Sequence, residues 1–463
     1  MSMKKSMKKS MKKCLALVLS LILAFSFCAC SQQSASSAVP DQQSTSSKEV
    51  ESTTPTTDKT ALTWMSWGHA RPQEIRQEAL EAAFPELAEK YMIEPVIGGK
   101  DVGAVVEKMR LGLAANDNLP DIFQTSSMYF PEMAASGVLA DVSYIYDKYE
   151  GELLDGMKDL CTYEGKQYAF PYCENTLVWI YRTDIFEDAG IDVSGIKTID
   201  DFIAAGEKLR EKYPDAYMHA GNVTDIATTF TWCAPGNDTK MIDENGNYIF
   251  KDDENAQALL TDLKKLYDSG LVYDVAAWTP DWEQGFANEK IVSYLTCNWF
   301  KDAAFLPTYA PETAGKWGVV TWPEIGGGKG GSENGGAMIM VLNDSPNKDA
   351  AIEVLESLCF TKEGNLAMYE ASDNSLTPVM IEAYNDPSVA AGDSFFGDVF
   401  WKGELESMSL YKTMDFTPAA ALESKILMPY IEKYLMGELS MEDALSQATS
   451  DMEIQIGNPL QMS

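Results

Sequence analysis

The residue types that most often carry out chemistry are scarce or widely spaced in this chain. Only two histidines are present, His69 and His219, which excludes a histidine-rich metal site and argues against a Ser-His-Asp triad. Five cysteines lie between residues 161 and 359, too far apart for CxxC metal motifs. Cys161 and Cys173 could form a disulfide, but the spacing leaves this open. The sequence therefore predicts no catalytic residue, metal ion or cofactor.

Side chains suited to noncovalent binding are more plentiful, since the chain has 10 tryptophans, 21 tyrosines and 18 phenylalanines. Aromatic faces fit the apolar CH faces of sugars, while neighbouring polar groups take the hydroxyls. Ligands of open α/β sheets bind beyond the carboxyl ends of strands, where loops begin. The candidates are Trp67, Gln124, Thr125, Ser126, Trp232 and Trp299. Trp278 is a further candidate. For each of these tryptophans, packing in the core is the alternative.

Apolar runs that alternate with amphipathic stretches must position these candidates. Strands are expected over residues 62–67, 93–97, 119–123, 177–181, 291–295, 317–320 and 336–342. Helices are expected over 74–91 with a break near Pro85, and over 102–115, 200–213, 255–269, 347–361, 363–371 and most of 418–456. This alternation predicts the α/β class, with a parallel sheet covered on both faces.

The order of several short motifs resembles the extracellular solute-binding proteins of ABC importers, the class that includes maltose-binding protein. The matching blocks are LPDI at 119–122, GVLAD at 137–141, GKQYAFPY at 165–172, WIYRTDIF at 179–186 with AGI at 189–191, FANEK at 286–290 running to NW at 298–299, SPNKDAA at 345–351 and FTKEG at 360–364. No single block is specific, but their shared order over residues 60–455 is.

The resemblance implies a fold of two α/β lobes that close on a ligand, the type II periplasmic-binding-protein clamshell. Lobe one would comprise residues 61–173 and 325–375, and lobe two residues 176–322 and 378–463. The chain would cross between the lobes near residues 174–175, 323–331 and 377. The glycine-rich run at 326–331 fits a hinge or loop better than a phosphate-binding loop, because the strand–GxxxxGK[ST]–helix context is missing.

The resemblance also implies particular ligand contacts. Trp299 matches the family's tryptophan that stacks on a sugar ring, and Tyr172, Glu174 and Asn175 stand at the first crossing. Gly335 and Gly336 match a glycine pair where backbone can approach a ligand closely. Sugar-binding relatives often carry an acidic or aromatic residue after the LPDI block, and here residues 124–126 depart from that pattern.

The amino terminus predicts export and lipid attachment. Six lysines precede an apolar run of about 13 residues, too short to span a bilayer. The following Cys28-Ala29-Cys30 resembles a bacterial lipobox, with Cys30 as the lipid anchor, Cys28 as the second choice and an ordinary secretory signal as the alternative. Residues 1–29 would be the signal peptide, and residues 30–60, rich in Ser and Thr, a flexible linker.

The net charge of the chain limits the classes of partner that it can bind. The formal net charge is −34, and removal of residues 1–29, with six lysines and no acid, makes it 30 − 70 = −40. This excess argues against nucleic acid. The resulting hypothesis is a monomeric, lipid-anchored solute-binding subunit on the extracellular face of the cytoplasmic membrane, which delivers a sugar or oligosaccharide to an ABC permease. The alternatives are a peptide- or polyamine-binding protein of the same fold and a surface glycoside hydrolase, although no motif singles out the paired carboxylates that an enzyme of this kind needs.

Overall fold

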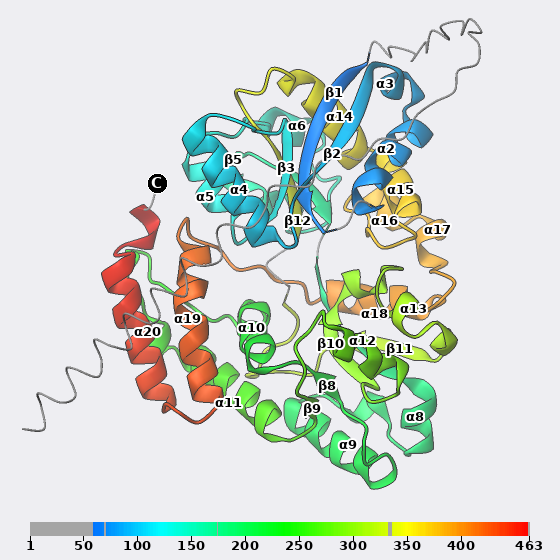
Figure 1. Ribbon diagram of the computed structural model, residues 1–463, viewed down its shortest axis with the longest axis vertical. Coiled ribbons are helices and arrows are strands. Elements are labelled where there is room, and N and C mark those ends of the chain that lie inside the picture. Colours follow the sequence, from blue (N-terminus) through cyan, green and yellow to red (C-terminus); the bar gives the residue numbers. More distant parts are fainter. Residues whose placement is uncertain (1–58, 69–70, 174, 332–335, 462–463) are drawn as a thin grey trace, which may run out of the picture. The chain divides into compact units, whose positions relative to one another are not determined.

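The computed structural model describes residues 59–68, 71–173, 175–331 and 336–461. The expected signal peptide at 1–29 and most of the linker at 30–60 lie outside the described residues. The predicted α/β class is confirmed, and Figure 1 shows the order of the elements along the chain. Within the described residues, no helix has the length and apolar character needed to cross a membrane.

One sheet has five strands in the order β2-β1-β3-β12-β6. The bounds are β1 Thr60–Trp67, β2 Tyr91–Gly99, β3 Ile122–Ser126, β6 Phe170–Cys173 and β12 Ala337–Val341. Strand β1 is parallel to β2 and β3, whereas β12 is antiparallel to both β3 and β6. Four of the five strands thus run in the same direction, as expected for a parallel sheet, and only β12 runs against them.

Helices pack on this five-stranded sheet where the apolar periodicity places them. They are α2 Arg71–Ala83, α3 Pro85–Lys90, α4 Val102–Ala115 and α14 Lys348–Cys359, while α15 Lys362–Ala371 packs on α2 and α14. The predicted break near Pro85 falls at Phe84, between α2 and α3. Helix α4 begins where the Asp101 carboxylate accepts a hydrogen bond from the Ala104 N–H at 2.9 Å. These elements share one buried core with strands β1, β3 and β12.

A second sheet has three strands in the order β10-β7-β11, namely β7 Leu177–Arg182, β10 Ser293–Cys297 and β11 Trp317–Thr321. Both pairs are antiparallel, so the expectation of a parallel sheet is wrong here. More than 100 residues separate β7 from β10, and no single crossover helix fixes their relative direction as it does in a βαβ unit. Helices α8 Thr183–Asp188 and α18 Val399–Met408 contact this three-stranded sheet.

Longer helices extend this second region. They are α9 Ile199–Lys212, α10 Val223–Cys233, α11 Glu254–Asp268, α19 Ala420–Leu435 and α20 Met441–Gln455. Helix α9 begins with a capping box, because the Thr198 side chain accepts from the Asp201 N–H while the Asp201 carboxylate accepts from the Thr198 N–H. The remaining short elements are α5 Phe130–Ala135, α6 Ser143–Lys148, α7 Met157–Leu160, β4 Thr162–Tyr163, β5 Lys166–Gln167, η1 Val193–Gly195, β8 His219–Ala220, η2 Phe250–Asp252, β9 Val272–Tyr273, α12 Pro280–Ala287, η3 Asn298–Lys301, α13 Leu306–Tyr309, η4 Pro311–Thr313, α16 Ile381–Tyr384, α17 Pro387–Ala390 and η5 Pro459–Gln461.

The chain passes from one sheet to the other at two short segments. Strand β6 ends at Cys173 in the five-stranded sheet, and β7 begins at Leu177 in the three-stranded one. Strand β11 ends at Thr321, and β12 begins at Ala337. Between them, Gly331 has a φ of +119°, and a Cβ there would lie 2.4 Å from the Trp232 carbonyl oxygen. Glycine is required at this position because the loop backbone packs directly against the end of α10.

Candidate functional site

Gln124, Thr125 and Ser126 were expected in a loop, and the structure corrects this. They are the last three residues of β3, and all three are buried. Strand β3 lies between β1 and β12, so its polar end is enclosed by neighbours on both sides. The hydroxyl oxygens of Thr125 and Ser126 are buried and have no hydrogen-bond partner among the described residues. Buried hydroxyls in this condition are well placed to bind a polar ligand or water.

The Gln124 side chain, unlike those of Thr125 and Ser126, has a hydrogen-bond partner, because it accepts from a buried arginine. The Arg76 Nη2 atom lies 2.6 Å from Gln124 Oε1 and 3.2 Å from Ser66 Oγ. Arg76 is on α2 and is 2% exposed. Its Nε and Nη1 atoms have no hydrogen-bond partner among the described residues. Gln124 therefore satisfies part of a buried guanidinium rather than projecting from a loop.

Aromatic rings surround the Arg76 guanidinium. Its central carbon lies 4.1 Å from the ring centroid of Trp64 and 5.7 Å from that of Tyr172. Burial lowers the pKa of Arg76 from its ordinary value, whereas burial raises the pKa of Tyr172. The sequence reasoning missed Arg76. Its position next to Ile75 and three residues before Ala79, on the apolar face of a predicted helix, was the available signal.

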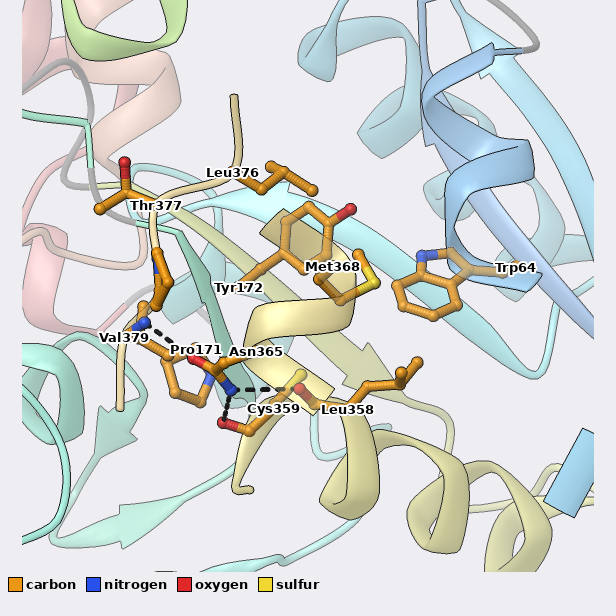
Figure 2. A pocket seen from close by; sticks show the side chains of 11 residues that line it. Trp64, Pro171, Tyr172, Leu358, Cys359, Asn365, Met368, Leu376, Thr377 and Val379 are labelled. Atoms are coloured by element: carbon orange, nitrogen blue, oxygen red, sulfur yellow. Dashed lines mark hydrogen bonds between the residues drawn. The ribbon is translucent and has the colours of Figure 1, made fainter. Parts of the chain in front are cut away.

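Figure 2 shows a cavity beside these rings, lined by Trp64, Tyr172, Met368, Asn365 and the segment at residues 376–379. The cavity volume is about 10 Å³, enough for about one water molecule. Asn365 closes one side, because its amide donates to the Leu358 and Cys359 carbonyl oxygens. A sugar ring cannot enter this space, so a sugar must bind outside it.

Three of the predicted segments meet at the start of β12. Ala337 is the register partner of Ser126 on one side and of Cys173 on the other. Gly336, immediately before it, has a φ of +95°, a conformation that favours glycine. Tyr172 lies in β6, and Asn175 follows that strand, partly buried. The structure thus brings the ends of β3 and β6 together beside Gly336.

Trp299 is linked to the same segment through the backbone. The Asn298 N–H donates to the Thr176 carbonyl oxygen at 3.0 Å, directly after Asn175. Trp299 is in η3, which follows β10 as expected, and its side chain is partly buried. Asn175 and Trp299 are therefore near neighbours in space, although more than 120 residues separate them in sequence.

Trp278, for which core packing was the alternative, is 53% exposed. Its ring centroid lies 5.6 Å from that of Trp299, and the two rings are inclined at 41°. Its φ is +64°, a left-handed conformation that is rare for a bulky residue. Core packing does not explain an exposed, strained tryptophan, so Trp278 belongs with Trp299 as one aromatic surface. No sequence signal marked this backbone conformation.

Two other predicted tryptophans lie apart from that aromatic surface. Trp232 is on α10, partly buried, with its ring centroid 6.3 Å from that of Trp322. Its carbonyl oxygen faces Gly331 in the loop between the sheets. Trp67 ends β1 and packs partly buried against the core of the five-stranded sheet. Glu174 and Gly335 lie outside the described residues.

Potential metal ligands and cysteines are dispersed among the described residues. Among the described residues, no group of three His, Cys, Asp or Glu side chains could hold a metal ion. Within the same residues, no disulfide joins the five cysteines. Burial raises the pKa of Cys161 to about 12, so this thiol stays protonated near neutral pH.

Comparison with known families identifies the chain. Residues 81–396 match the family model of bacterial extracellular solute-binding proteins. The protein belongs to the bacterial extracellular solute-binding protein family. The resemblance in the motif order is therefore confirmed. Family members and their structural neighbours are binding proteins.

Individual relatives of this solute-binding protein are distant. It is 26% identical over 275 residues to the arabinooligosaccharide-binding protein of Bacillus subtilis, an alignment that covers 58% of this chain and 62% of that protein. It is 24% identical to the lactose-binding protein of Rhizobium radiobacter, over 63% of this chain and 69% of that protein. The chain thus spans less than two thirds of the Bacillus subtilis relative.

Solved structures establish the fold. The GacH receptor of Streptomyces glaucescens matches with a TM-score of 0.71 at 19% identity, covering 86% of this chain and 98% of that one. The galacto-N-biose-/lacto-N-biose I-binding protein of Bifidobacterium longum also gives 0.71, at 18% identity, covering 87% and 99%. The predicted type II periplasmic-binding-protein fold is confirmed.

Proposed function

We propose that this solute-binding protein captures a sugar or oligosaccharide outside the cell and delivers it to the permease of an ABC transporter. Named relatives bind arabino-oligosaccharides, lactose and diacetylchitobiose, which supports carbohydrate as the solute class. The protein acts as a monomer and performs no chemistry on the solute. The observation that carries the proposal is the partly exposed Trp278–Trp299 surface, joined by backbone to the polar segment at Asn175.

The physical basis of capture is a division of labour between ring faces and polar groups. The partly buried Trp299 ring offers an apolar face, and the half-exposed Trp278 ring enlarges it. Tyr172 and Asn175 supply polar atoms, and the unpartnered Ser126 hydroxyl lies at the adjoining strand end. Glu174 and Gly335 remain part of the proposed site on the basis of the motif resemblance. The remaining candidates would hold these contact residues in place and would not touch the sugar themselves; they are Trp67, Gln124, Thr125 and Trp232.

Closure would involve the two lobes expected from the motifs, residues 61–173 with 325–375 and residues 176–322 with 378–463. The change of sheet between β6 and β7, and again between β11 and β12, supports crossings at residues 174–175 and 323–331. Closure would be driven by contacts that form only when both lobes touch the solute.

A lipid on Cys30 would keep the protein near its permease, with residues 31–60 as the tether, and would raise the effective concentration of loaded protein there. The Cys30→Ser chain should be released into the medium. The Cys28→Ser chain should stay with the membrane and incorporate labelled palmitate. Release of the second variant instead would move the anchor to Cys28.

The proposal is tested with the full chain purified in mild detergent. Its melting temperature is followed with arabinotriose, lactose, diacetylchitobiose, a peptide mixture and spermidine, and the sugars are then checked for breakdown by chromatography. A rise with at least one sugar, with the sugar recovered intact, supports the proposal. Stabilisation by peptide or spermidine alone would reassign the solute, and sugar breakdown would make the protein an enzyme.

A further inference from the structure

A buried carboxylate lies against the turn that carries Trp299. Glu404, on α18, is fully buried. Its Oε1 atom accepts from the Asn298 amide at 2.8 Å and from the Thr377 hydroxyl at 2.5 Å. Its Oε2 atom accepts from the Lys301 ammonium at 2.8 Å. Asn298 and Lys301 are the two ends of η3, so Glu404 holds the turn on both sides of Trp299.

The Lys301 ammonium is buried, like the Glu404 carboxylate with which it pairs. Lys301 is 8% exposed, and its Nζ atom also donates to Thr377 Oγ1 at 2.9 Å. The aromatic rings of Phe400 and Tyr369 lie 5.5 Å and 6.0 Å from the same nitrogen. Both charges are thus removed from water, and each depends on the other for compensation. Such a closed set of hydrogen bonds has one geometry and resists rearrangement.

Thr377 connects this set to the five-stranded region. The Asn365 side chain, on α15, accepts from the Val379 N–H at 2.9 Å (Figure 2). It also accepts from the Met380 N–H at 3.1 Å. Those backbone groups lie two and three residues after Thr377, at the expected third crossing. The segment that donates to Glu404 is therefore fixed to α15 as well.

The first crossing is tied to the same turn. The Asn298 N–H donates to the Thr176 carbonyl oxygen, while the Asn298 side chain donates to Glu404. The Thr176 backbone and the Thr377 side chain are thereby connected, through Asn298 and Glu404, to one turn of chain, and Trp299 is part of that turn. A rotation of the chain at Thr176 must move Asn298 or break the hydrogen bond between them, and a rotation at Thr377 must move Glu404 or break its hydrogen bond to the Thr377 hydroxyl.

We propose that Glu404 is a positioning residue: it fixes the orientation of Trp299 and makes that orientation depend on the chain at residues 175–176 and at residue 377. The inference rests on the proposed sugar-binding function in one respect, that the Trp299 face contacts the solute. The coupling itself is a property of the unliganded protein. Ligand stacking on Trp299 and movement at the crossings then occur as one event.

The decisive measurement needs no ligand. The full chain is labelled with 5-fluorotryptophan, and the Trp299 resonance is assigned by its loss in Trp299→Phe. In Glu404→Gln, which keeps the size of the side chain and removes its charge, we expect this resonance to shift or split. An unchanged Trp299 resonance would overturn the proposal, whatever the solute proves to be.

Glu423→Gln is the matched control. Glu423 is also a buried glutamate, 6% exposed, which accepts from the Tyr248 hydroxyl at 3.0 Å, but no hydrogen bond joins it to η3 among the described residues. Burial raises the pKa of Glu423 from its ordinary value. This variant should leave the Trp299 resonance in place. An equal shift in both variants would mean that a general loosening of the fold is being observed.

A second variant guards against simple unfolding. Thr377→Val removes one hydrogen bond to Glu404 and keeps the Lys301–Glu404 pair, so the fold should survive. With arabinotriose, lactose and diacetylchitobiose as probes, we expect both variants to weaken binding, Glu404→Gln by about tenfold, because a displaced ring loses contact area. If Glu404→Gln with Lys301→Met recovers the melting temperature and the full affinity together, the role of Glu404 is structural only and the proposal fails.

Discussion

The two sheet regions bury different kinds of side chain at the ends of their strands. In the five-stranded region the end of β3 is polar and enclosed, with Gln124 satisfying the Arg76 guanidinium and Ser126 left without a described partner. In the three-stranded region the end of β10 leads into aromatic rings, of which Trp278 is half exposed. One region therefore offers directional hydrogen bonds and the other offers ring faces. A sugar, which has hydroxyl edges and apolar faces, is complementary to both.

Replacing Trp299 removes the main ring face of the three-stranded region and is the most direct test of its role in binding. Trp299→Ala should weaken sugar binding about 100-fold, or about 2.7 kcal/mol, because a central aromatic contact is lost while the hydroxyl partners remain. Isothermal titration with the sugar found in the melting screen measures the loss.

The matched control is Trp401→Ala. Trp401 is a partly buried tryptophan on α18, with its ring centroid 4.6 Å from that of Tyr384. Its loss should lower the melting temperature without weakening the sugar complex. Equal affinity of Trp299→Ala and the parent chain would remove the stacking role assigned to Trp299.

The polar side can be split into a structural and a binding part. Gln124→Leu should destabilise the fold by about 2 kcal/mol, because a hydrogen bond to a buried charge is lost. Ser126→Ala should change the unfolding free energy by less than about 0.5 kcal/mol, since its hydroxyl has no described partner to lose, and should weaken sugar binding. Urea unfolding and titration separate the two effects. A destabilised Ser126→Ala chain would mean that this hydroxyl serves the fold.

Sequence patterns predicted the bounds of helices better than they predicted which residues are buried and what those residues contact. Helix α4 matches its expected bounds, because these are set by local apolar spacing and by the local hydrogen bond of the Asp101 cap. The burial of residues 124–126 depends on β12, more than 200 residues later, and no local pattern could supply it. Glu404 was missed for the same reason, since its partner Asn298 is more than 100 residues away, whereas Arg76 could have been found from its place on the apolar face of a predicted helix.

The two regions also differ in how their buried ionisable groups respond to pH. Arg76 carries a charge in the five-stranded region, whereas burial lowers the pKa of His219, in the other region, from 6.5 to about 3. Its Nδ1 atom accepts from the Leu295 N–H, and its ring stacks on Tyr294. The unfolded chain binds a proton below pH 6.5 that the folded chain refuses until about pH 3, so stability falls as the pH drops through this window.

The expected slope from His219 is about 1.4 kcal/mol per pH unit well below pH 6.5. Urea unfolding at pH 7, 5.5 and 4.5 should show this slope in the parent chain and its absence in His219→Gln, whose amide oxygen can still accept from Leu295. Parallel pH profiles of the two chains would mean that folding does not lower the pKa of His219.

The smallest effect concerns the backbone beneath the aromatic surface. Trp278 holds a φ of +64°, which glycine adopts freely and alanine does not. Trp278→Gly and Trp278→Ala both remove the ring, so both should weaken sugar binding by the same modest factor. The glycine variant should nevertheless be more stable than the alanine variant by about 1 kcal/mol, the cost of the left-handed conformation for a residue with a Cβ. The reverse order in urea unfolding would show that the strain is absent in solution. The predicted order would mean that the fold tolerates a strained backbone where it presents a ring to solvent, and that binding is the reason for it.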